Sequence, residues 1–416
     1  MIPIYPAGSK PKPGSAAAVP AQAGADTSAG RLQLATLPPL SLYIHFPWCV
    51  RKCPYCDFNS HEAEKGSSGF PEQAYMAALR RDLEMALPQI WGRKIYTIFI
   101  GGGTPSLMSA GALDQLLSDV RSLLNLDAAA EITMEANPGT FEAEKFAAYR
   151  ASGVNRLSIG IQSFNSRQLQ ALGRIHDGEQ ARRAIDIAAT HFDNFNLDLM
   201  YALPQQTLAE ARADLQTAID YAPTHLSLYH LTLEPNTVFA KYPPALPDDD
   251  ESGEMQDQLW QMAADAGYAQ YEVSAYAKAG RQARHNLNYW QFGDYLGIGA
   301  GAHSKISFPN RIVRQVRYKQ PKTYIEQVQQ GTPLVEEQDL TRHDLGFEFM
   351  LNTLRLVDGF APALFGERTG QSIVAIEQGL RLAEQKGLLL RDHTLIRPTP
   401  LGQRFLNDLQ QMFLPD

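Results

Sequence analysis

Cysteine is scarce in this sequence. The chain has three cysteines among 416 residues, and all of them lie between positions 49 and 56. An odd number of cysteines packed this closely cannot form a disulfide framework. Cys49, Cys53 and Cys56 therefore predict a ligand set for a metal centre. Because a reducing compartment keeps such thiols available, we expect a cytoplasmic protein.

Long hydrophobic runs and an excess of positive charge are also absent. No run of about 18 or more apolar residues occurs, so the sequence predicts no transmembrane helix. The chain carries 37 basic and 45 acidic residues, which gives a formal net charge of −8. This balance disfavours a protein that binds nucleic acid by neutralising phosphates.

The N-terminal segment has few charges and no long apolar run. Residues 1–37 are rich in Ala, Pro, Gly and Ser. A segment of this composition cannot bury a hydrophobic core, so we expect residues 1–37 to be a disordered tail. A signal peptide is the alternative, and it is disfavoured because Pro and Gly interrupt every candidate apolar region.

Residues 38–305 alternate short apolar strands with amphipathic helices. The expected strands lie at residues 41–46, 96–100, 131–135, 156–161, 196–201 and 226–233. The expected helices lie at residues 71–87, 111–124, 141–151, 178–190 and 207–221. This alternation is typical of βαβ units with right-handed crossovers and a parallel sheet. We therefore predict an α/β fold, with a partial (β/α)6 barrel resembling a TIM barrel.

Residues 306–416 predict a second domain that is mostly helical. The expected helices at 342–355, 361–366 and 371–386 precede a hairpin at 388–398 and a last helix at 400–412. This order resembles a winged helix, which raises DNA binding as an alternative. Residues 321–416 contain nine basic and thirteen acidic residues, a net charge of −4. That charge favours a packing or partner-binding domain over a DNA-binding one.

The cysteines form a C-x3-C-x2-C loop directly after the first expected strand. Thiolates are the usual ligands of iron–sulfur clusters, and three of them can hold three irons of a [4Fe–4S] cluster. No other cysteine can bind the fourth iron, which leaves that iron open to the amino and carboxylate groups of S-adenosylmethionine. Zinc completed by His45 or His61 is the alternative, but structural zinc sites favour two separated C-x2-C pairs.

The cysteine loop, with Tyr55 before its last cysteine, resembles the radical S-adenosylmethionine superfamily. The wider segment YIHFPWCVRKCPYCDFNSH, residues 43–61, is similar to the oxygen-independent coproporphyrinogen III oxidase-like family. The resemblance extends over about residues 40–416. It implies a [4Fe–4S] cluster, S-adenosylmethionine and a porphyrin-type ligand such as heme.

The resemblance also implies further contacts to S-adenosylmethionine. Gly101–Thr104 follow an apolar strand without the spacing of a phosphate-binding loop, and the family holds the methionine amino group at such a turn. Contacts to the ribose, carboxylate and adenine are expected near the ends of the neighbouring strands. The matching residues are Tyr43, Gly102, Gly103, Thr104, Glu135, Gln162, Arg174 and Asp198. His176 is expected in a surface turn outside the site.

Two features separate the heme chaperones of this family from its oxidases. The oxidases carry a further cysteine two residues after the third cluster ligand, where this chain has Phe58. The sequence His285-Asn-Leu-Asn-Tyr289-Trp290 matches an H-N-x-x-Y-W motif typical of the chaperones. Imidazole is a common ligand of heme iron, so His285 is a candidate heme ligand and His303 a competing one. The structural alternative for His285 is a hydrogen-bonded histidine at the barrel rim.

Two functions follow from the resemblance. A heme chaperone would bind heme and deliver it to apo-hemoproteins, and the family implies respiratory-chain recipients. The sequence leaves peripheral membrane contact undecided. An oxygen-independent coproporphyrinogen III oxidase would use the cluster and S-adenosylmethionine to convert propionate side chains into vinyl groups. The motifs favour the chaperone, so we expect no oxidase activity.

Overall fold

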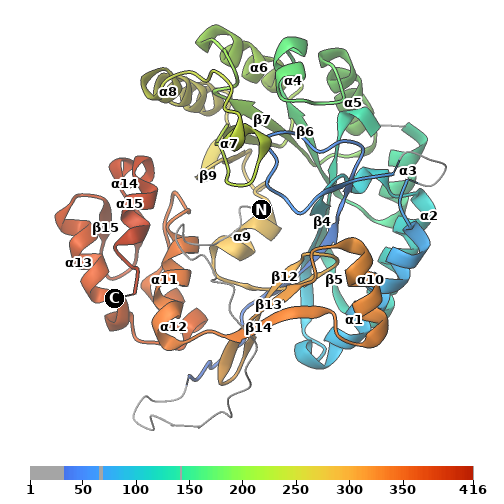
Figure 1. Ribbon diagram of the computed structural model, residues 1–416. Coiled ribbons are helices and arrows are strands. Elements are labelled where there is room, and N and C mark those ends of the chain that lie inside the picture. Colours follow the sequence, from blue (N-terminus) through green and yellow to red (C-terminus); the bar gives the residue numbers. More distant parts are fainter. Residues whose placement is uncertain (1–31, 65–68, 141–142, 416) are drawn as a thin grey trace.

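The structure is a computed structural model that describes residues 32–64, 69–140 and 143–415 (Figure 1). Within these residues the main sheet has 12 strands. Its centre is a parallel series in chain order: β1 (Leu40–Phe46), β4 (Lys94–Gly102), β5 (Asn125–Ala136), β6 (Arg156–Gln162), β7 (Phe195–Tyr201) and β8 (His225–His230). All the predicted strands are thus confirmed, and the series curves into the predicted partial barrel.

Helices cover the outer face of the parallel strands. They are α1 (Glu72–Ile90), α2 (Ala110–Leu123), α3 (Ala143–Ser152), α5 (Gly178–His191) and α6 (Leu208–Asp220). The last two begin with capping boxes, in which Asp177 and Thr207 each accept hydrogen bonds from the first helical turn. Alternate strand residues, such as Leu157, Ile159 and Ile161 of β6, form the core beneath these helices.

The other face of each strand points into the barrel, and there polar side chains pair with one another. The Thr97 hydroxyl donates to Ser41 Oγ at 2.8 Å. The Asn196 amide donates to Ser158 Oγ at 2.8 Å, and His225 Nδ1 lies 2.7 Å from Asn196 Oδ1. Because unpaired polar groups are costly away from water, this pairing allows the inner face to remain polar.

The sheet extends beyond the parallel series on both sides. On one side, β11 (Asp294–Ile298) lies parallel to β1 and leads into antiparallel β12 (His303–Phe308), β13 (Arg311–Arg317) and β14 (Leu334–Asp339). On the other side, β10 (Ala275–Ala277) and β9 (Ala269–Glu272) follow β8. These strands were not predicted. The domain boundary expected at residues 305 and 306 stays a prediction, and the sheet itself continues to Asp339.

Shorter elements and connections complete the part of the chain before residue 340. They are β2 (Trp48–Cys49), β3 (His61–Glu62), η1 (Pro105–Leu107), η2 (Pro138–Thr140), α4 (Ser166–Ala171), α7 (Val238–Lys241), α8 (Asp249–Asp265), α9 (Arg284–Trp290) and α10 (Pro321–Gln330). Figure 1 shows α9 between the barrel and the C-terminal helices. Across the described ranges, no helix combines the length and apolar character that a membrane span requires.

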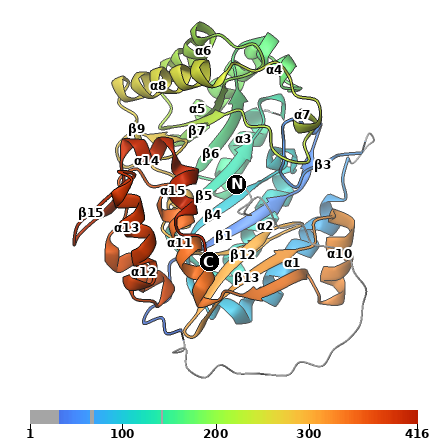
Figure 2. The same ribbon diagram turned by 60° about the vertical axis from the view of Figure 1, so that its left-hand side comes forward.

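The C-terminal elements confirm the predicted helices and hairpin. They are α11 (Arg342–Thr353), α12 (Pro362–Thr369), η3 (Ile373–Ile376), α13 (Glu377–Gln385), β15 (Leu389–Arg391), β16 (Ile396–Pro398), α14 (Pro400–Arg404) and α15 (Leu406–Gln411). Figure 2 shows them as a group beside the sheet. They share a core around Phe349 and Phe365, into which Leu34 also packs. The packed chain therefore begins before residue 38, while residues 1–31 of the expected tail lie outside the described residues.

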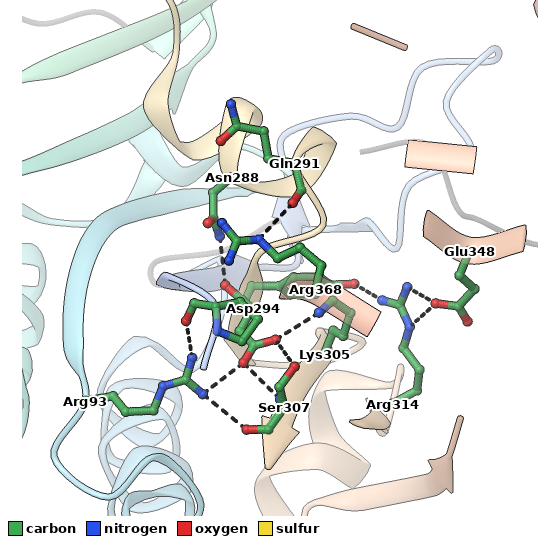
Figure 3. Close-up of polar contacts among 11 residues, drawn as sticks. Arg93, Asn288, Gln291, Asp294, Lys305, Ser307, Arg314, Glu348 and Arg368 are labelled. Carbon is green, nitrogen blue, oxygen red and sulfur yellow. Dashed lines mark hydrogen bonds and ion pairs between the residues drawn. The ribbon is translucent and has the colours of Figure 1, made fainter. Parts of the chain in front are cut away.

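A buried charge network connects the extended sheet with the C-terminal helices (Figure 3). Asp294 of β11 is fully buried, and its carboxylate lies 2.9 Å from both Arg93 and Lys305. Close by, Arg314 of β13 pairs with Glu348 of α11. Each charge of this network thus lies beside an opposite charge, which buried ions require.

Candidate cofactor and metal site

The cysteine loop lies at the mouth of the barrel, where the parallel strands end. It leaves β1 through β2, and the short parallel pair of β2 with β3 folds the loop back on itself. The Cys56 N–H donates to the Cys53 carbonyl at 3.1 Å, and the Cys56 sulfur lies 3.8 Å from Ser60 Oγ. All three thiols are half-buried. The loop therefore presents a compact set of sulfur ligands at one end of the sheet.

These ligands fit an iron–sulfur cube. In a cube each thiolate binds a different iron, so its cysteines need not converge on one point. In the part of the chain that the structure describes, no three His, Cys, Asp or Glu side chains are arranged to hold a single metal ion. Both nitrogens of His45 are hydrogen bonded, at 2.9 Å to the Tyr43 hydroxyl and at 2.8 Å to the Asn59 carbonyl. His45 is therefore not available to complete the alternative zinc site.

Two thiols of the loop, Cys49 and Cys56, ionise less readily than a free cysteine. Burial raises the pKa of the Cys49 thiol to about 11 and also raises the pKa of Cys56. Since a metal binds the thiolate form, cluster assembly releases protons. The guanidinium of Arg174 lies beside the loop, with Nη1 at 3.8 Å from Cys53 Sγ.

Arg174 also joins the loop to the end of β6. Its Nη2 donates to the Gly160 carbonyl at 2.7 Å. Gln162, the last residue of β6, has a positive φ of 67° and folds its amide over Gly160. A Cβ on Gly160 would lie 2.9 Å from the Gln162 amide nitrogen, so a side chain there would displace the Gln162 amide. The predicted residues Gln162 and Arg174 thus lie together next to Cys53.

The glycine turn after β4 packs directly against the cysteine loop. The Thr104 N–H donates to the Trp48 carbonyl at 2.7 Å. A Cβ on Gly103 would lie 2.4 Å from the same carbonyl oxygen, a distance that no side chain tolerates. Gly102 adopts φ 118°, which L-residues with a side chain rarely adopt. These residues let the turn approach the cysteine loop closely, while its contact with the methionine amino group stays a prediction.

Two carboxylates lie on the inner face of the barrel, Glu135 towards the mouth and Asp198 between the mouth and the floor. The Gly102 N–H donates to Glu135 Oε2 at 3.0 Å, and the Ser158 hydroxyl donates to Asp198 Oδ2 at 3.1 Å. Burial raises the pKa of Glu135 to about 7, and repulsion from Asp198 adds to this rise. Such a pair favours a cationic ligand, and S-adenosylmethionine carries a sulfonium and an amino group.

The remaining predicted contact, Tyr43, lies in β1 on the same inner face. Its hydroxyl bonds to His45, and its ring lies 6.3 Å from the ring of Phe99 in a stacked arrangement. The residues predicted to contact S-adenosylmethionine therefore surround one end of the barrel. Their contact with the cofactor stays a prediction.

The prediction for His176 was wrong. This residue is 3% exposed, and its Nε2 lies 3.1 Å from the Ile161 carbonyl. Burial, followed by the charge of Arg174, lowers the pKa of His176 to about 3. The turn after Arg174 therefore packs against the end of β6, and the His176 ring contacts the backbone of that strand next to the site.

His285 lies on α9 and is 1% exposed, with both ring nitrogens close to hydroxyl groups. Nδ1 lies 2.8 Å from the Thr97 hydroxyl, and Nε2 lies 3.2 Å from the Tyr289 hydroxyl. The Thr97 hydroxyl donates to Ser41, so it accepts from His285 Nδ1–H. Nε2 then accepts from Tyr289. Burial lowers the pKa of His285 to about 3, so the ring is neutral.

The other aromatic residues of the motif attach α9 to its neighbours. The ring of Tyr289 lies 4.5 Å from the ring of Tyr295 in an edge-to-face arrangement. The Arg355 guanidinium lies 4.3 Å from the Trp290 ring and pairs with Glu272 at 3.2 Å. These contacts join α9 to the sheet and to the C-terminal helices. The competing candidate His303 begins β12, where burial lowers its pKa to about 4.

Sequence reasoning missed several residues of the inner face. Phe99 and Tyr229 point into the barrel, on the same strand faces as Thr97 and Ser227. Tyr229 is 40% exposed there. Arg156 lies deeper, at the start of β6. The signal was present in the strands, because alternate residues such as Arg156, Ser158 and Gly160 are polar or small.

Comparison with known protein families matches both parts of the chain. The radical SAM superfamily matches residues 43–218, and the HemN C-terminal domain matches residues 340–405. The second match covers the helices and hairpin of the predicted C-terminal domain.

Near full-length relatives and a solved structure extend these matches. The chain is 48% identical over 386 residues to heme chaperone HemW from Haemophilus influenzae, covering 91% of this chain and 99% of that protein. It is 49% identical over 382 residues to heme chaperone HemW from Escherichia coli, with coverage of 91% and 99%. The structure of coproporphyrinogen III oxidase (HemN) from Escherichia coli, a radical SAM enzyme, is 24% identical, with a TM-score of 0.77 and coverage of 91% and 90%. That likeness establishes the shared fold.

Proposed function

The chain belongs to the heme chaperone HemW family within the radical SAM superfamily, and from this premise we propose that it binds heme and delivers it to apo-hemoproteins. The observation that carries the proposal is the near full-length similarity to heme chaperones from two bacteria. The His285–Trp290 motif, which is typical of the family's chaperones, agrees with it. We further propose a cytoplasmic location and respiratory-chain recipients.

The proposal includes a [4Fe–4S] cluster and S-adenosylmethionine. Cys49, Cys53 and Cys56 would hold the cluster, which supplies a redox centre and an open iron when bound. Arg174 contacts both Cys53 and the Gly160 carbonyl, and it therefore joins the loop to β6. Glu135, with Asp198 nearby, offers negative charge to the sulfonium and amino groups of S-adenosylmethionine.

We place the heme iron at His285 Nε2. The hydrogen bond from Nδ1 to Thr97 fixes the tautomer in which Nε2 carries a lone pair, and metal-binding histidines commonly have such a supporting partner. The Tyr289 hydroxyl occupies this lone pair, so heme binding requires Tyr289 to move aside. The ring is neutral because of its burial, which suits an iron ligand.

The alternative function is oxygen-independent coproporphyrinogen III oxidation. Phe58 occupies the position of the further cysteine that the oxidases carry, and its side chain is 39% exposed on the cysteine loop. Phenylalanine cannot supply the thiol of that cysteine. This difference favours the chaperone.

One experiment separates the two functions. The cluster is reconstituted anaerobically, and the protein is then titrated with heme while the Soret band is recorded. In parallel, the protein receives coproporphyrinogen III, S-adenosylmethionine and a reductant, and the products are separated by chromatography. We expect stoichiometric heme binding and no product with vinyl groups. Formation of vinyl product, or failure to bind heme, would overturn the proposal.

Two matched variants locate the heme. His285→Ala removes the proposed ligand, and His303→Ala removes the competing histidine. We expect only His285→Ala to abolish the Soret spectrum of a histidine-ligated heme. Circular dichroism and iron content of both variants check that the fold and the cluster survive. An unchanged Soret spectrum in His285→Ala would exclude this ligand and leave a packing role for the residue.

A further inference from the structure

A buried arginine without a partner lies inside the barrel. Arg156 begins β6 and is 2% exposed. Within the described residues no hydrogen bond or ion pair holds its guanidinium, and its Nε is buried without a partner. Arg317 is equally buried, but it donates two hydrogen bonds to the Asp82 carboxylate, at 2.6 and 3.0 Å. Buried charges are normally paired, so the interior of the barrel lacks an anion at Arg156.

A second unpaired donor lies directly beside Arg156. Thr133 of β5 is its partner in the strand register and is fully buried. The Thr133 hydroxyl also has no hydrogen-bond partner among the described residues. A guanidinium and a hydroxyl on neighbouring strands can together bind the two oxygens of a carboxylate.

The acids near Arg156 are already engaged elsewhere. Glu131 accepts hydrogen bonds from the backbone N–H groups of Arg284 and His285, at 3.3 and 3.2 Å. Asp198 accepts hydrogen bonds from Ser158 at 3.1 Å and from Asn196 at 2.7 Å. Neither forms an ion pair with Arg156, although the charge of Arg156 acts on Asp198 from a distance. The N–H donors of the arginine therefore remain available for a ligand.

Aromatic rings lie on the same inner face, closer to the mouth. Tyr229 is 40% exposed, and Phe99 is half-buried. Residues 156 to 162 of β6 span about 20 Å from the floor to the mouth, since a strand rises about 3.3 Å per residue. The interior therefore combines aromatic walls with a cationic floor. This chemistry suits a flat apolar ring that carries carboxylates.

We propose that Arg156 and Thr133 bind a propionate carboxylate of heme at the floor of the barrel. The guanidinium donates two N–H groups to the carboxylate oxygens, and the Thr133 hydroxyl donates a third hydrogen bond. The inference rests on the proposed heme binding. It assigns a site separate from the cysteine loop, which lies at the opposite end of the strands.

The test compares heme with heme dimethyl ester, in which both propionates lack their charge. Affinities of the cluster-loaded protein are measured by Soret titration for the wild type, Arg156→Gln and Arg156→Lys. We expect Arg156→Gln to weaken heme binding at least about tenfold and to leave ester binding unchanged. Arg156→Lys keeps the positive charge but loses the planar guanidinium with its two parallel N–H donors. We therefore expect an intermediate loss of affinity for heme and no loss for the ester.

The outcomes are distinct. If Arg156→Gln changes the affinities for heme and for the ester equally, or changes neither, the proposed carboxylate site is wrong. Arg156 would then balance the charge of the interior or bind water. Thermal unfolding and iron content identify a variant that fails to fold, and Thr133→Val then provides a milder second test of the same heme-to-ester ratio. If the wild type binds neither ligand, the proposed function fails and not this inference alone.

Discussion

Glu135 is the residue of the mouth whose ionisation bears most directly on cofactor binding. Burial raises its pKa to about 7, so the carboxyl is largely neutral below that pH and ionised above it. Because S-adenosylmethionine is cationic, we expect its affinity for the cluster-loaded protein to rise as the pH increases through about 7. Isothermal titration between pH 6 and 8 measures this change.

The matched variant for this pH dependence is Glu135→Gln. It keeps an acceptor for the Gly102 N–H but cannot ionise. We expect it to bind S-adenosylmethionine more weakly at high pH and with little pH dependence. A wild-type dependence that persists in Glu135→Gln would assign the titration to another group, with Asp198 as the first candidate.

Tyr289 blocks the nitrogen of His285 that we propose as the ligand of the heme iron. Its hydroxyl donates to Nε2 at 3.2 Å, so Tyr289→Phe leaves this nitrogen free. One hydrogen bond contributes about 1 kcal/mol, and we expect heme affinity to rise about fivefold. Tyr271→Phe is the matched control, because it frees His225 Nε2 in the same way, from a contact of 2.8 Å. Equal effects of both variants would contradict the placement of heme at His285.

At the scale of elements, the contact between the glycine turn and the cysteine loop tolerates no side chain. A Cβ on Gly103 would lie 2.4 Å from the Trp48 carbonyl, so one of the two segments must move. We expect Gly103→Ala to lower the free energy of unfolding by about 1–3 kcal/mol and to reduce the iron retained per chain. Chemical denaturation and iron analysis measure both effects.

Gly111 provides the control for this variant. It lies in α2, and a Cβ there would meet nothing within 4 Å. Gly111→Ala should stabilise the protein by about 0.5–1 kcal/mol, because alanine favours the helix, and it should leave the iron content unchanged. A Gly103→Ala variant that behaves like Gly111→Ala would show that the turn does not need its close approach.

The parallel strands were predictable because buried strands between helices are short, apolar and evenly spaced. β4 and β7 have this character. The flanking strands lack it: β14 reads LVEEQD and is mostly exposed, and β9 and β10 have only four and three residues. Their pairing depends on tertiary contacts that a local pattern does not contain.

The residues at the mouth of the barrel were predictable from sequence motifs, whereas those at its floor were not. Cys53, Glu135 and Gln162 are recognised from the residues around them in sequence. Arg156 becomes notable only when its missing partner is visible, which is a property of the folded interior. The error at His176 has the same origin, since its burial depends on how the turn folds under β6.

At the scale of the whole molecule, the buried Asp294 carboxylate holds β11 to Arg93 and to Lys305 of β12. Asp294→Asn would leave Arg93 and Lys305 buried beside a neutral group. We expect a loss of about 3–5 kcal/mol in the free energy of unfolding. Asp257→Asn is the control, because it removes an exposed ion pair with Arg404, and it should cost less than about 1 kcal/mol. Equal losses would contradict a structural role for the network.

The same network predicts an acid-dependent stability. Burial raises the pKa of Asp294, but Lys305 and Arg93 lower it more strongly, so the net shift is downward from 3.8. A lowered folded-state pKa gives stability that is present above the unfolded value and is lost as the pH falls through the folded value. Denaturation curves below about pH 4 should therefore show a steeper loss in the wild type than in Asp294→Asn.

Delivery of heme is the central claim for the whole molecule, and transfer kinetics test it most directly. Heme-loaded protein is mixed with increasing concentrations of an apo-cytochrome of the respiratory type, and the Soret change is followed by stopped flow. Direct handover predicts a transfer rate that rises with the concentration of the acceptor. A rate that equals spontaneous heme release and stays constant at every acceptor concentration would contradict the chaperone function.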